Sequence, residues 1–104
     1  MGKKDKRMAP KRARILREAK AGLDDRSDVL VCLSPGEAGS GIQVKIESTL
    51  MSLFGDQIRA SVLEVIEGYG LNDLKLTVND RGALDYAIRA RVQTAIERAL
   101  KEGD

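Results

Sequence analysis

The sequence predicts a two-layer α+β fold, in which a four-stranded, mostly antiparallel sheet is covered on one face by helices. Its 104 residues are the usual size of one domain. Hydrophobic residues make up 42% of the chain but aromatic residues only 3%, so the core is aliphatic. Segments with two-residue alternation are separated by segments with helical spacing, and their order along the chain is ββαββα.

The N-terminal segment differs from the rest of the chain in charge. Residues 1–20 contain nine Lys or Arg and two acidic residues, a net charge of +7, whereas residues 21–104 have a net charge of −5. Residues 1–8 are too polar to pack, and residues 10–19 could form a short basic helix. We therefore predict a basic, partly disordered arm over residues 1–20 and one domain over residues 21–104.

Two strands are expected early in the domain. After a loop of Asp and Ser over residues 22–28, residues 29–33 form a continuous β-prone apolar run that ends before Pro35. Cys32 within this run is expected to be a buried core thiol. Residues 42–46 alternate between apolar and polar, which predicts a second strand antiparallel to the first.

A long helix should follow the second strand. Ser48 or Thr49 can cap its N-terminus, and Gly68 and Gly70 can end it in left-handed geometry. One stripe of apolar residues at three- and four-residue spacing would face the sheet: Leu50, Phe54, Ile58, Val62, Val65 and Tyr69.

The C-terminal third is the most ambiguous part of the sequence. Residues 74–78 alternate as a third strand, but residues 83–92 fit both a two-residue and a helical period. Residues 79–82, Asn-Asp-Arg-Gly, have strong hairpin-turn chemistry. We therefore predict a fourth strand over residues 83–92 and a short helix over residues 93–101.

The residue types present argue against an enzyme. Histidine is absent, which removes the commonest general base and the commonest zinc ligand, and a single Cys cannot form an internal disulfide. Asp56, Asp80 and Asp85 could pair as carboxylates, but turn or solvent-facing positions account for each. No catalytic residue and no metal site is predicted. On the strand prediction, Arg89 and Arg91 project from one sheet face and could grip phosphate or carboxylate groups.

No apolar run approaches the roughly 20 residues of a membrane span, and the N-terminus has no apolar stretch of a signal peptide. A cytoplasmic protein is expected.

Two segments carry a likeness to a known family. Residues 54–58, Phe-Gly-Asp-Gln-Ile, and residues 76–92, which include the Gly-Ala-Leu-Asp and Arg-Ala-Arg blocks, resemble the citrate lyase acyl carrier protein (gamma subunit) family. The likeness extends over about residues 19–100.

This resemblance implies a non-catalytic carrier subunit. A serine would bear a covalently attached 2'-(5''-phosphoribosyl)-3'-dephospho-CoA group, whose thiol holds acetyl and then citryl as thioesters. The implied partners are the alpha (acyl transferase) and beta (acyl lyase) subunits of citrate lyase and a prosthetic-group transferase, with no membrane or nucleic-acid partner.

The attachment serine is displaced by one residue in this chain. In the family it follows Ala-Gly and stands two residues before an aspartate, in a pattern like Glu-Ser-Gly-Asp. Aligning Ala21-Gly22 and Asp28 places Arg26 at the serine position and Ser27 one position later. Ser27, on an exposed loop, is the expected attachment site. The alternatives are a malonate decarboxylase-type carrier, a divergent unmodified paralogue, and a small nucleic-acid-binding module that uses the basic arm.

Overall fold

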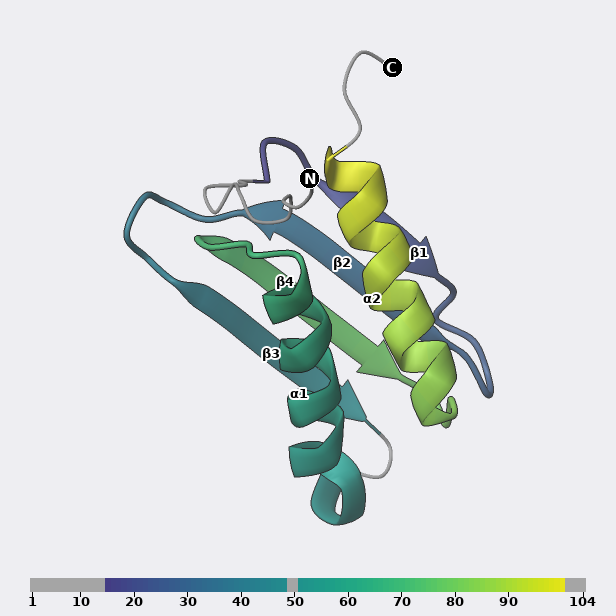
Figure 1. The fold of residues 1–104 in the computed structure, drawn as a ribbon. Helices are drawn as coiled ribbons and strands as arrows, with labels where there is room; N and C mark the ends of the chain where they lie inside the picture. Colours follow the sequence, from purple (N-terminus) through teal and green to yellow (C-terminus); the bar gives the residue numbers. More distant parts are fainter. Residues whose placement is uncertain (1–14, 49–50, 101–104) are drawn as a thin grey trace, which may run out of the picture.

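The computed structural model of the chain describes residues 15–48 and 51–100, which form four strands and two helices (Figure 1). In chain order they are β1 (Ala19–Gly22), β2 (Val29–Pro35), β3 (Ile42–Ser48), α1 (Met51–Gly68), β4 (Leu74–Asp80) and α2 (Asp85–Leu100). The order is therefore βββαβα.

The strands form one mixed sheet in the order β1-β2-β4-β3. β2 pairs antiparallel with β1 and with β4, whereas β3 pairs parallel with β4. The predicted α+β fold with a four-stranded, mostly antiparallel sheet is confirmed. Residues 42–46 run antiparallel to residues 29–33, as predicted, but the two strands are not hairpin neighbours, because β4 lies between β2 and β3. The reason is that α1 crosses over between β3 and β4, and strands joined by such a crossover run parallel.

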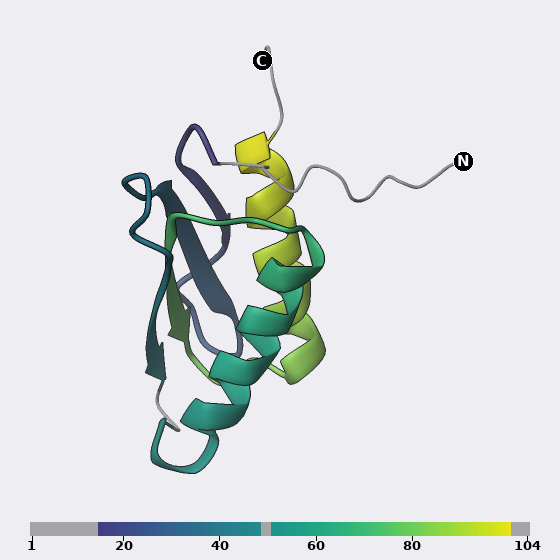
Figure 2. The ribbon, with the colours of Figure 1, turned by 60° about the vertical axis from the view of Figure 1, so that its left-hand side comes forward.

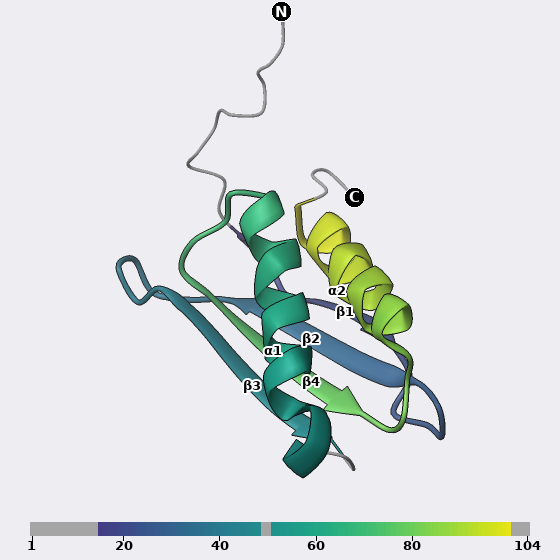
Figure 3. The same ribbon diagram turned by 60° about the horizontal axis from the view of Figure 1, so that its bottom comes forward.

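Both helices cover the same face of the sheet, as the turned views show (Figures 2 and 3). α2 packs on β1 and β2, α1 packs on β3, and the two helices contact each other. The core between the layers consists of aliphatic side chains, as the composition indicates. Its members with the largest fully buried side chains are Leu33, Ile66, Leu74, Leu76, Ile88, Ile96, Val29, Val31, Val62, Val78 and Val92.

The other face of the sheet carries no helix. Along β2 the buried residues are Val29, Val31 and Leu33, so the side chain of Cys32 points to the opposite, uncovered face and is partly exposed. The expectation of a buried core thiol is therefore wrong. Alternation along the strand, rather than the apolar character of the run, determines which side chains enter the core.

Residues 83–92 do not form the predicted fourth strand. Asp85–Leu100 is one continuous helix, in which the buried residues follow the helical period: Ile88, Val92, Ala95, Ile96 and Ala99. Leu84 and Tyr86 suggested the two-residue period, but they are 61% and 72% exposed. The fourth strand of the sheet is instead β1.

The domain begins before the position expected from the charge pattern. Ile15 is buried in the core, and β1 begins at Ala19. Residues 15–18 are not helical, and the remainder of the expected basic helix lies outside the described residues. Within the described part, residues 15–20 thus belong to the domain rather than to the arm. No described helix is long and apolar enough to cross a membrane.

Candidate functional site

Ser27 lies in the loop between β1 and β2, and its side chain is exposed. The loop is closed by its aspartates. The backbone N–H of Asp28 donates to the carbonyl of Asp25 over 3.0 Å, and the Asp25 carboxylate accepts the N–H of Arg26 over 2.7 Å. Short polar side chains that bond nearby backbone groups favour such a turn. The structure therefore places Ser27 on an exposed loop, as expected.

The backbone of Ser27 is fixed by the loop that follows β4. Its N–H donates to the carbonyl of Arg81 over 2.8 Å, and the N–H of Arg81 donates to the carbonyl of Asp28 over 2.9 Å. The Arg81 guanidinium also contacts the Asp24 carboxylate at 3.1 Å. These contacts hold the Ser27 loop and the β4–α2 loop side by side.

Ser27 has a φ of 63°, which is left-handed backbone that non-glycine residues seldom adopt. In the alignment through Ala21-Gly22 and Asp28, Ser27 occupies the position of the glycine in the Glu-Ser-Gly-Asp pattern. The backbone of this turn thus suits the family's glycine at residue 27, and Arg26 stands where the family has its serine.

The carboxylate of Asp28, which follows Ser27, is held by two partners. It accepts the N–H of Val29 over 2.7 Å, and the Arg91 guanidinium lies 3.3 Å away. The bond from Val29 lowers the pKa of the Asp28 carboxyl below its ordinary value, and the charge of Arg91 lowers this pKa further, against the opposing effect of burial.

Asp80 organises the turn between β4 and α2. It is 4% exposed, and one of its carboxylate oxygens accepts the N–H groups of Gly82 and Ala83 over 3.2 and 2.8 Å. The other oxygen accepts the hydroxyl of Ser48, at the end of β3, over 2.8 Å. The turn role that the sequence indicates for Asp80 is confirmed. Ser48 is in β3, and the other expected cap, Thr49, lies outside the described residues.

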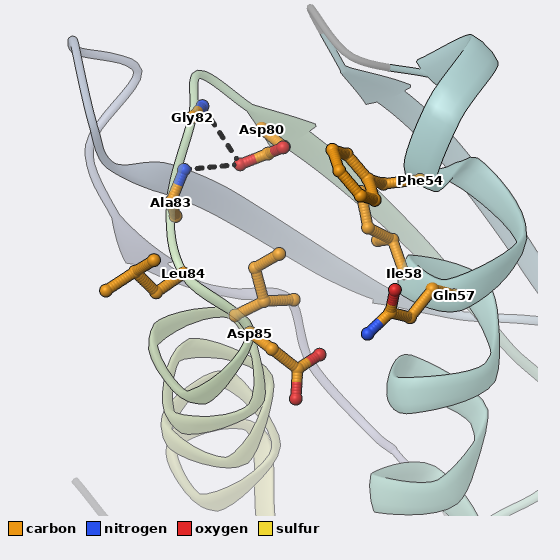
Figure 4. Close-up of a pocket in the computed structure, with 9 residues that line it drawn as sticks. Phe54, Gln57, Ile58, Asp80, Gly82, Ala83, Leu84 and Asp85 are labelled. Carbon is orange, nitrogen blue, oxygen red and sulfur yellow. Dashed lines mark hydrogen bonds between the residues drawn. The ribbon is translucent and has the colours of Figure 1, made fainter.

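A pocket of about 300 Å³ opens between the N-terminal half of α1 and this turn (Figure 4). It is lined by Phe54, Gln57, Ile58, Asp80, Gly82, Ala83, Leu84, Asp85 and Ile88. The sequence interpretation did not identify this pocket, because the strand prediction for residues 83–92 separated these residues in space. The helical period of Ile88 and Val92 was the signal that could have brought them together.

Asp85 joins the two helices beside the pocket. Its carboxylate accepts the Ser61 hydroxyl over 2.6 Å and the Arg89 side chain over 2.9 Å, and Arg89 also contacts Glu64 at 2.7 Å. The bond from Ser61, followed by the bond from Arg89, lowers the pKa of Asp85 against the effect of burial. The solvent-facing role expected for Asp85 is thus only part of its function.

The expected pairing of Arg89 and Arg91 on one face is wrong. Residues two apart on a helix point about 200° apart, and here Arg89 contacts α1 while Arg91 contacts Asp28. The two arginines therefore form ion pairs with different carboxylates of the domain and do not form one joint binding site. Asp56, the remaining candidate carboxylate, is exposed on α1. The part of the chain that the structure describes contains no group of three or more Cys, Asp or Glu that could hold a metal ion.

Apolar side chains are exposed around the same end of the domain. Leu23 in the β1–β2 loop, Phe54 on α1, and Leu84 and Tyr86 at the start of α2 are all large and exposed. Exposed apolar side chains gathered on one surface are typical of a protein interaction site.

Comparison with known proteins identifies the family. Residues 16–99 match the family described as malonate decarboxylase delta subunit (MdcD). The citrate lyase acyl carrier protein of Halothermothrix orenii is 40% identical over 84% of this chain and 90% of that protein, and the one from Yersinia enterocolitica is 42% identical over 86% and 91%.

The fold is also similar to a solved structure. A chain of a Pseudomonas malonate decarboxylase hetero-tetramer superposes with a TM-score of 0.68 at 18% identity, over 83% of this chain and 87% of that one. This likeness concerns the fold alone. The sequence relatives decide the family: this chain belongs to the acyl carrier proteins of the citrate lyase type.

Proposed function

We propose that this protein is the acyl carrier subunit of a citrate lyase complex and that Ser27 is its attachment residue. The observation that carries the proposal is an exposed serine hydroxyl on a turn whose backbone is fixed by two hydrogen bonds to the β4–α2 loop. A fixed backbone presents the hydroxyl to a modifying enzyme in one geometry. The attached group would be 2'-(5''-phosphoribosyl)-3'-dephospho-CoA, whose thiol carries acetyl and citryl as thioesters.

The role of this chain in the attachment is to supply a nucleophile. Ser27 Oγ forms a bond to the α-phosphorus of the triphosphate-activated precursor, diphosphate leaves, and the hydroxyl proton passes to a base of the transferase. Because the transferase supplies the base, the carrier needs none, which agrees with a chain that has no histidine.

The exposed apolar residues near Ser27 fit the carrier role. A carrier must meet a transferase, an alpha (acyl transferase) subunit and a beta (acyl lyase) subunit in turn. Leu23, Leu84 and Tyr86 offer apolar contact area on the same end of the domain as Ser27. Transient docking at this end would bring the tethered acyl group to each active site at high effective concentration.

The experiment is co-expression with a family transferase, followed by peptide mass spectrometry. The adduct is expected on the peptide that contains Ser27 and is expected to disappear in Ser27→Ala. Ser34→Ala and Ser40→Ala, which change serines in and after β2, are the matched controls and should keep the adduct. An adduct on another serine would refute the site.

A second variant separates a changed site from a lost modification. The double substitution Arg26→Ser with Ser27→Gly restores the Ser-Gly-Asp pattern without altering the turn's fixed backbone, because glycine suits the φ of 63° at residue 27. If this variant is modified and the parent chain is not, the protein is the unmodified paralogue, and the proposal is wrong.

A further inference from the structure

The pocket between α1 and the β4–α2 loop is lined in part by Gly82, which is a neighbour of Ser27. The Cα of Ser27 lies 4.0 Å from the position that a Cβ on Gly82 would occupy, and Gly82 lines the pocket. The N–H of Ser27 is bonded to Arg81, the residue before Gly82. A group attached to Ser27 therefore starts next to a residue that lines this pocket.

The residues that line the pocket suit a small ligand that contains both apolar atoms and amide groups. Phe54, Ile58 and Ile88 supply apolar surface, and Gln57 and Asp85 supply polar atoms (Figure 4). A volume of about 300 Å³ is near the lower limit of ligand pockets. It is enough for the acylated end of a pantetheine arm but not for a nucleotide.

The charges at the pocket discriminate between acyl groups. Two carboxylates, Asp80 and Asp85, line the pocket, and none of its described lining residues is basic. Arg89, which is on the same helix as Asp85, offsets the charge of that carboxylate. Asp80 instead accepts hydrogen bonds only from neutral groups, those of Ser48, Gly82 and Ala83, among the contacts described above. A negatively charged acyl group is repelled here, and an uncharged one is not.

We propose that this pocket receives the acyl-bearing end of the arm attached at Ser27, and that it favours an uncharged acyl group such as acetyl over one that carries carboxylates. The inference rests on the proposed function. The arm is a long flexible tether whose acyl end stays near Ser27 with an effective concentration on the order of millimolar, so an intrinsic dissociation constant of about 1 mM is enough to fill the pocket for a large share of the time.

The first test uses the unmodified chain and free S-acetylpantetheine. A titration to about 10 mM, followed by two-dimensional ¹H–¹⁵N NMR, is expected to shift the amide signals of Gln57, Gly82, Ala83 and Leu84 with a millimolar dissociation constant. S-succinylpantetheine, which adds one carboxylate, should bind at least about threefold more weakly. No shift at these residues, or equal binding of the two probes, would overturn the proposal.

Variants show that the binding is in the pocket. Ala83→Phe fills it and should abolish the shifts, and Gln57→Trp on the exposed rim is a second blocking variant in case Ala83→Phe does not fold. Ala60→Phe, the same substitution at an exposed position of α1 outside the pocket, is the matched control and should bind like the parent. Unchanged binding in both folded blocking variants contradicts the proposal.

The titration does not require modification of Ser27, so its outcome is independent of whether the attachment proposal holds. For modified protein whose arm carries acetyl, the readout is the rate at which added hydroxylamine cleaves the acetyl thioester to a hydroxamate and the free thiol of the arm, followed by the intact mass of the chain. We expect this rate to rise about threefold or more when Ala83→Phe is added. An equal rate, with the adduct confirmed on Ser27 by mass, would show that the arm is attached but does not enter the pocket.

Discussion

The guanidinium of Arg91, on α2, lies 3.3 Å from the carboxylate of Asp28, at the residue that follows Ser27. The two residues are 63 positions apart, so this ion pair links the second helix to the Ser27 loop. It forms because Arg91 is on a helix that packs over β1 and β2. The Arg-Ala-Arg block that identified the family thus has a structural role at the site, in which its second arginine positions the Ser27 turn.

Replacing Arg91 should weaken both stability and the order of this turn. Arg91→Gln is expected to lower the free energy of unfolding by a small amount, because the pair is partly exposed and screened by solvent. Urea unfolding measures this change, and a double-mutant cycle with Asp28→Asn isolates the pair. Strictly additive effects of the two substitutions would show that the contact contributes nothing. Arg98→Gln, which removes a bond to the Lys20 carbonyl instead of an ion pair, is the control.

Gly22 and Gly39 share left-handed backbone geometry but differ in their surroundings. The φ of Gly22 is 91°, and a Cβ there would lie 1.8 Å from the carbonyl oxygen of Val29, whereas Gly39 has a similar φ of 84° and open space around it. Gly39→Ala should therefore cost only the backbone strain of about 1 kcal/mol. Gly22→Ala should cost about 3 kcal/mol or more, because β1 must move away from β2. Thermal unfolding of the pair measures the difference, and equal losses would contradict the close approach.

Several elements of the fold could be predicted from the sequence because their local patterns agree with their environment. Residues 29–33, 42–46 and 74–78 are strands, and the helix predicted after residue 48 is α1. The family was also predicted, from the blocks around residues 54–58 and 76–92.

The errors arose where a local pattern had two solutions. Residues 79–82 have hairpin-turn chemistry, and residues 83–92 fit a two-residue period as well as a helical one. In the structure the turn leads into a helix: Asp80 accepts the N–H groups of Gly82 and Ala83, and α2 follows at Asp85. The sheet order was missed because strand pairing depends on the path of the chain between strands. A helix between residues 42–46 and 74–78 was predicted, and its crossover implies parallel neighbours.

Within the candidate site, the sequence predicted the local turn but not the contacts between segments that are distant in the chain. The aspartates around Ser27 predicted an exposed turn. Nothing near Ser27 in the sequence indicates that Arg81 and Gly82 lie beside it, because that contact results from the antiparallel pairing of β2 with β4, in which Val29 is opposite Asp80. The pocket depends on the same pairing and on α2.

Asp80 should be necessary for the β4–α2 turn through its oxygen atoms rather than its charge. Asp80→Ala removes the acceptor for two backbone N–H groups and one hydroxyl, so the expected loss in unfolding free energy is about 2–3 kcal/mol. Asp80→Asn keeps one acceptor oxygen and should lose about 1 kcal/mol or less. Chemical denaturation of both variants tests the order, and an equal loss would assign the effect to the charge.

The first eight residues should be dispensable for folding. They offer almost no apolar area to bury, since they consist mainly of Lys, Arg, Asp and Gly. Deleting residues 1–8 is expected to shift the thermal midpoint by no more than about 1–2 °C. A larger loss would mean that the basic arm packs on the acidic domain. The same deletion in a salt titration of RNA affinity tests the nucleic-acid alternative, in which binding would be strong and would disappear with the arm.

Two carboxylates, Asp28 and Asp85, should make the fold sensitive to acid. The folded-state pKa values of Asp28 and Asp85 lie below the value of about 3.9 for an unfolded aspartate. Above that unfolded value both carboxylates are ionised in both states, so their stabilisation is complete; it is lost as the pH falls through the lowered folded values. With no histidine in the chain, no histidine titration adds a step between pH 5 and 8. The thermal midpoint should thus change little between pH 7 and about pH 5 and fall steeply below about pH 4.

Substitutions of the two carboxylates test this assignment. Asp28→Asn and Asp85→Asn should each lower the midpoint at pH 7. Each should also make the acid decline shallower, because the unfolded state then has one carboxylate fewer that binds a proton more readily than the folded state. Asp56→Asn, at an exposed position of α1, controls for the loss of one negative charge. An acid decline as steep in Asp28→Asn as in the parent would show that the bond from Val29 and the contact with Arg91 do not stabilise the charged form of the residue beside Ser27.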